Sequence, residues 1–132
     1  MISFSKLLKL KKALLLVGCM ATLSVSHAQD ATIGQITEGL FVMSYNARLA
    51  VYCDMPPESA SAMHRTLASL EGFARENLQA PVVDRALNAG LADLAATQAV
   101  ATKAELCEPT RLAMLPSMLE DALAEILPVS DE

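Results

Sequence analysis

Cys53 and Cys107 could form a disulfide, bind a metal or act in redox chemistry, and the cellular compartment of the chain decides between these. In an oxidising compartment an isolated pair of this kind forms a disulfide, whereas in a reducing one it more often binds a metal or acts in redox chemistry. No CxxC motif is present, and no second cluster of cysteine and histidine completes a zinc site. We therefore predict a structural disulfide between them in an exported protein, and we expect neither a metal nor a cofactor.

The other groups that could act as catalysts occur without partners. His64 is the only histidine after position 28, and residue 61 is a serine, so the Glu-x-x-His spacing of di-iron bundles is absent. After position 28 there is neither a G-x-S-x-G nucleophile elbow nor an S-x-x-K motif. The carboxylates of residues 120, 121 and 125 fit a solvated helix face. We therefore expect that the protein is not an enzyme.

A stripe of aromatic residues is the clearest candidate for binding. Phe41, Tyr45, Leu49 and Tyr52 follow each other at steps of four, four and three, which places them on one side of a helix with Arg48 beside them. We call these five residues the aromatic strip. A surface helix needs only one apolar face, and a separate seam of aliphatic residues already supplies it. Two interpretations are open: the helix is the central one, or the strip binds a protein partner or a second copy of the chain.

The N-terminal segment has the layout of a bacterial secretory signal peptide. Four lysines lie in the first twelve positions, an apolar run spans 13–25, and Ser26-His27-Ala28 supplies the small residues that signal peptidase reads. The apolar run is too short for a membrane span. We predict cleavage after Ala28 and a periplasmic or secreted protein. The alternative is a lipoprotein anchored through Cys19, which completes a loose lipobox.

The negative net charge of the chain limits the classes of molecule that it is expected to bind. The chain has a formal net charge of −5, and loss of the four N-terminal lysines leaves six of its ten basic residues against all 15 carboxylates. An acidic chain of this kind is repelled by nucleic acid and by anionic lipid surfaces. We expect a protein partner or self-association, no nucleic acid, no membrane span and no small-molecule ligand.

Proline spacing and a composition rich in alanine and leucine predict helices at 31–52, 57–78, 81–106 and 110–127. We expect Asp54 to cap the second helix, and we expect Pro116 to kink or interrupt the fourth. Gly90 weakens the third helix by about 1 kcal/mol relative to alanine. Helix ends at Cys53 and near Cys107 would meet at one pole of an up-down-up-down bundle, which makes the disulfide geometrically natural.

We therefore predict an all-α fold, a small up-down-up-down four-helix bundle with one disulfide. The signal peptide covers 1–28, a single helical domain covers 29–127, and an acidic disordered tail covers 128–132. The functional expectation is a non-enzymatic interaction domain, such as a chaperone, inhibitor, immunity protein or envelope-assembly accessory protein. The alternative is a carrier of an apolar small ligand within the bundle.

Overall fold

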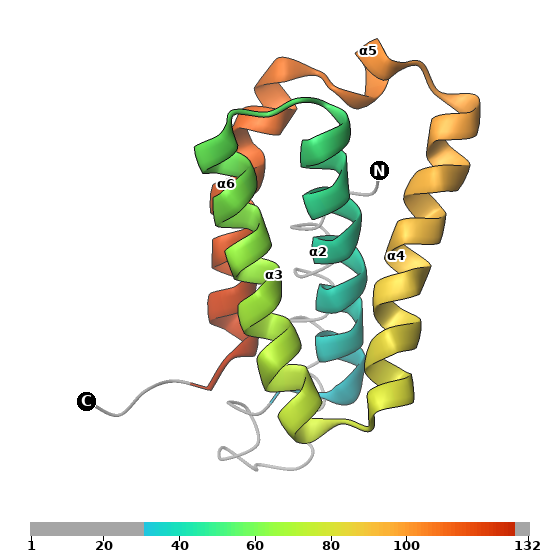
Figure 1. The fold of residues 1–132 in the computed structure, drawn as a ribbon. Coiled ribbons are helices and arrows are strands. Elements are labelled where there is room, and N and C mark those ends of the chain that lie inside the picture. Colours follow the sequence, from blue (N-terminus) through green and yellow to red (C-terminus); the bar gives the residue numbers. More distant parts are fainter. Residues whose placement is uncertain (1–30, 129–132) are drawn as a thin grey trace, which may run out of the picture.

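The computed structural model describes residues 31–128, and every regular element within them is a helix. In chain order these are α2 (Ile33–Tyr52), α3 (Pro57–Asn77), α4 (Ala80–Val100), α5 (Lys103–Leu106) and α6 (Pro109–Ile126). The four long helices run side by side, and the segment that carries α5 spans from α4 to α6 across one end (Figure 1). The predicted all-α fold is confirmed. The predicted signal peptide, Cys19 and residues 129–132 of the predicted tail lie outside the described residues.

Side-chain caps explain where α2 and α6 begin. At α2 the Thr32 hydroxyl accepts the Gln35 amide at 3.1 Å, while the Gln35 side chain accepts the Thr32 amide at 2.8 Å. This reciprocal pair is a capping box, which satisfies two amides that a helix start leaves open. At α6 the Glu108 carboxylate accepts the amides of Thr110 and Arg111 at 3.1 and 2.9 Å. Both starts follow from local sequence.

The predicted cap of the second helix is wrong. The N-cap residue of α3 is Pro56, which makes no side-chain hydrogen bond, and Pro57 occupies the first helical turn, where its missing amide costs nothing. Asp54 instead lies in the turn with a φ of 55°. Its carboxylate is 3.5 Å from the Lys103 ammonium. The double proline therefore moved the helix start beyond the reach of Asp54.

The predicted helix at 81–106 is two helices. α4 ends at Val100 because Ala101 is extended, with φ −114° and ψ 148°. Thr102 then starts α5 with a second capping box. The Thr102 amide donates to the Glu105 carboxylate, and the Thr102 hydroxyl accepts a hydrogen bond from the Glu105 amide. A threonine side chain that caps a new helix competes with continuation of the preceding helix, and here the chain ends α4 and begins α5. By contrast, α6 is continuous through Pro116.

Helix α2 is the centre of the packing, since it contacts α3, α4 and α6. Its tightest approach is to α4 at Gly90, where an added Cβ would collide with the Ser44 hydroxyl and the Phe41 carbonyl. The Ser44 hydroxyl donates to the Leu87 carbonyl at 3.1 Å and so links the two helices. Gly90 therefore provides a close backbone approach and leaves α4 unbroken. This packing is compatible with the predicted up-down-up-down bundle.

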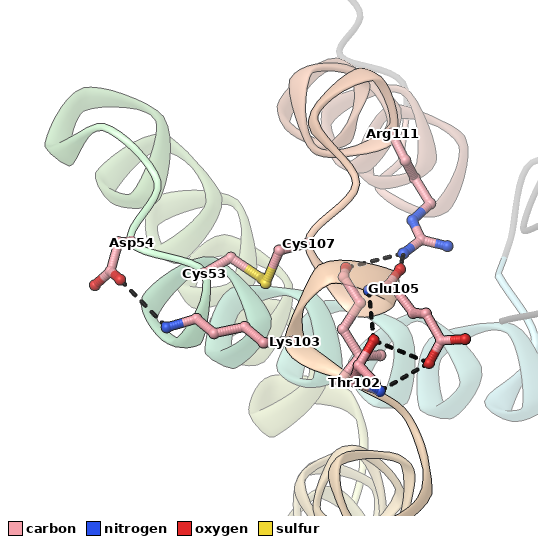
Figure 2. The surroundings of a disulfide bond; sticks show 8 residues. Cys53, Asp54, Thr102, Lys103, Glu105, Cys107 and Arg111 are labelled. Carbon is pink, nitrogen blue, oxygen red and sulfur yellow. Dashed lines mark hydrogen bonds and ion pairs between the residues drawn. A yellow bond between two sulfur atoms is a disulfide. The ribbon is translucent and has the colours of Figure 1, made fainter.

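The predicted disulfide between Cys53 and Cys107 is confirmed, with an S–S distance of 2.03 Å. It joins the end of α2 to the end of α5, as Figure 2 shows. Lys103 approaches the same end of α2, because its ammonium lies 5.1 Å from the Tyr52 ring centroid. Among the described helices, none is long and apolar enough to cross a membrane.

Candidate functional site

The aromatic strip is divided between core and surface. Tyr45 and Leu49 are 5% and 2% exposed and belong to the hydrophobic core. Phe41 and Tyr52 are half-buried, and Arg48 is exposed. The central position of α2 accounts for the two buried side chains. Binding by the strip stays a prediction, and the strip residues that reach the surface are Phe41, Arg48 and Tyr52.

One surface hollow lies between α2 and α4 and has a volume of about 430 Å³. We call it the interhelix hollow. Its apolar wall combines Phe41 with Val82, Ala86 and Ala89 of α4. The charged residues at this hollow are Glu38 and Arg85. It gives Phe41 a neighbouring apolar surface from a second helix.

A second hollow, of about 310 Å³, lies where α2, α4, α5 and α6 approach one another near the disulfide. We call it the connector hollow. Leu49, Val100 and Leu106 supply apolar surface, and Val100 is 87% exposed. The ionisable side chains of the lining include Glu105 and Arg111. This hollow therefore combines an apolar wall with two opposite charges.

Arg111 is held in place by the connector. Its Nη2 atom donates to the carbonyls of Glu105 and Leu106, both at 2.8 Å, which satisfies two acceptors at the end of α5 (Figure 2). Its Nε is buried and has no hydrogen-bond partner among residues 31–128. The guanidinium is therefore fixed but not fully satisfied.

Glu105 is a fixed negative charge at the same hollow. Its Oε1 accepts the Thr102 amide at 2.8 Å and the Thr102 hydroxyl at 3.1 Å. The bond from the Thr102 amide, followed by that from its hydroxyl, lowers the pKa of the Glu105 carboxyl below its ordinary value. Within the described chain, Glu105 and Arg111 form no ion pair with each other, and in Figure 2 the Glu105 carboxylate points toward Thr102 while the Arg111 guanidinium points toward the backbone of the connector.

The two hollows follow one side of the α2–α4 pair. On α2 the lining residues Phe41, Tyr45 and Leu49 are spaced by four, and on α4 the lining runs from Val82 to Val100. Such spacing keeps side chains on one helix face. Three residues of the aromatic strip therefore contribute to the lining of the two hollows.

His64 and the methionines of the bundle lie apart from this face or in the interior. His64 is exposed on α3, and its Nδ1 lies 2.8 Å from the Ala60 carbonyl oxygen. Met43 and Met63 are fully buried in the core, whereas Met114 is 55% exposed. In the part of the chain that the structure describes, no group of three or more histidine, cysteine and acidic side chains could hold a metal ion.

Sequence reasoning missed the charged pair of the connector hollow. One signal was available, because Thr102-Lys103-Ala104-Glu105 matches the spacing of a capping box only if Glu105 is the third residue of a new helix. That reading would have placed Glu105 and Cys107 on a short connector. It would not have placed Arg111 beside them, since that contact depends on how α6 docks.

Comparison of the chain with family models, curated proteins and solved structures finds no match.

Proposed function

We propose that the protein is an exported, non-enzymatic interaction domain that binds a protein partner along the α2–α4 face. The up-down-up-down bundle serves as a rigid support in this proposal. The single observation that carries it is that residues of the aromatic strip line two surface hollows, whose walls combine apolar side chains of α2 and α4. The partner contacts are Phe41, Arg48 and Tyr52, with the exposed alanines of α4 beside them.

Two physical features support a protein partner. Half-buried aromatic side chains next to an exposed arginine are typical anchors of interfaces. The α4 wall of the interhelix hollow includes small side chains, and the exposed Ala89 allows a partner's helix to approach closely. A second copy of the chain can supply that helix, so self-association is an outcome of the same test.

Export is part of the proposal. The disulfide fits an oxidising compartment, and the absence of a spanning helix among the described residues fits a protein without a membrane domain there. A bacterial periplasm is such a compartment. Affinity capture with the purified chain identifies whether the partner is a client, a toxin or an assembly component.

The test compares two alanines of α4. Ala89→Arg places a charged side chain in the interhelix hollow, whereas Ala95→Arg makes the same change at an exposed position outside both hollows. We expect affinity capture with the wild-type chain and with Ala95→Arg to recover the same partner, and Ala89→Arg to lose it. Analytical ultracentrifugation of the three proteins reports self-association. Equal recovery by both variants contradicts the proposed surface.

A further inference from the structure

We propose that the connector hollow binds a free α-amino acid with an apolar side chain. This site goes beyond the partner surface, because the proposed partner contacts Phe41, Arg48 and Tyr52 do not line the connector hollow. An amino acid of this class presents a carboxylate, an ammonium and an apolar group. The hollow offers one complementary group to each of them.

Arg111 is the group that faces the carboxylate. The two hydrogens of its Nη2 are used by the carbonyls of Glu105 and Leu106, which fixes the plane of the guanidinium. A guanidinium has five donors, and Nη1 makes no hydrogen bond with the described residues. A carboxylate is the acceptor that a guanidinium binds best. Nη1 is therefore available for the ligand, and the protein has already restricted its position.

Glu105 is the group that faces the ammonium. Its Oε1 is used by Thr102, and Oε2 has no hydrogen-bond partner in the described chain. The Thr102 bonds keep the carboxyl ionised at neutral pH. Two opposite charges at one hollow normally attract each other, yet here each is held by its own backbone partners. A ligand that carries both charges can bridge them, whereas a simple anion is repelled by Glu105.

The apolar group meets Leu49, Val100 and Leu106. Val100 is 87% exposed, so the fold itself gains little from a valine there. A volume of about 310 Å³ lies at the lower end of the range for ligand pockets, which suits a ligand of one residue. Because the hollow is open and the ligand small, we expect affinity in the millimolar range.

Three ligands that differ by one charge test the recognition. NMR titration of the purified full chain with leucine should shift the signals of Val100 and Arg111. Leucinamide lacks the carboxylate and N-acetyl-leucine lacks the ammonium. We expect each to bind at least about tenfold more weakly, because one charge at the hollow is then left without a partner. Equal affinity for leucine and either analogue overturns the proposal, as does the absence of any shift.

Matched variants identify the residues. Glu105→Gln removes the charge and retains the cap, since Gln35 has the same role at Thr32. We expect leucine to bind it about tenfold more weakly, while Glu120→Gln, an exposed change on α6, leaves affinity unaltered. Val100→Ser replaces an exposed side chain and should weaken leucine binding severalfold without altering the fold. Unchanged affinity in both Glu105→Gln and Val100→Ser contradicts the assignment.

Discussion

Gly90 and Gly72 both lie inside helices, but only Gly90 is needed for close packing between helices. Alanine is favoured over glycine by about 1 kcal/mol at such positions. At Gly90 an added Cβ would meet the Ser44 hydroxyl and the Phe41 carbonyl, whereas at Gly72 it would meet nothing within 4 Å. The first glycine permits the contact between α2 and α4. The second has no such role.

We therefore predict that Gly90→Ala destabilises the protein by up to about 2 kcal/mol, since an overpacking cost of about 1–3 kcal/mol exceeds the gain in helix propensity. Gly72→Ala is the matched control and should stabilise by about 0.5–1 kcal/mol. Urea unfolding of both variants measures the difference. If the two substitutions change the midpoint in the same direction, the close approach at Gly90 does not control stability.

At the scale of elements, the connector between α4 and α6 is the part of the described chain whose structure depends most on contacts with other elements. α5 has four residues, too few to form a stable helix in water. Contacts with its neighbours hold it: the Thr102 cap, the two hydrogen bonds from Arg111, the disulfide at Cys107, the approach of Lys103 to α2 and the burial of Leu106. Its geometry therefore depends on the elements that it connects.

Replacing Cys53 and Cys107 with serine should have a global and a local effect. The two cysteines are 54 residues apart, and the chain-entropy model gives a loss of about 4 kcal/mol for a loop of that length. We also expect amide exchange at residues 101–108 to accelerate more than exchange in the core of α2, because α5 loses its covalent attachment to α2. Denaturant unfolding and hydrogen exchange measure the two effects. Unchanged exchange at 101–108 would show that the noncovalent contacts alone position α5.

The elements also show which features the sequence could predict. The helix at 31–52 and the disulfide were predictable because apolar spacing and an isolated cysteine pair depend on local pattern and compartment. The division of α4 from α5 was missed because helix propensity across Ala101 is high and the Thr102 cap outweighs it. Burial of Tyr45 was not predictable, since it depends on α4, α5 and α6 meeting around α2.

At the scale of the whole molecule, the described fold begins where the predicted signal peptide has already ended. Thr32 caps α2, and Ala31 packs against the core. Cleavage after Ala28 therefore removes none of the described residues. Cleavage before Cys19 would instead leave an apolar stretch attached to an acidic domain and anchor it to lipid.

We predict that the exported form begins at Gln29, with or without the loss of ammonia that cyclises an N-terminal glutamine. Intact mass spectrometry of the exported protein checks this. Signal peptidase requires a small residue before the cleaved bond, so Ala28→Trp should retain the precursor. Cys19→Ser should leave processing unchanged, because serine is tolerated in an apolar region that is only recognised and removed. If Cys19→Ser blocks processing and Ala28→Trp does not, the chain is a lipoprotein, and its α2–α4 face works at a membrane surface.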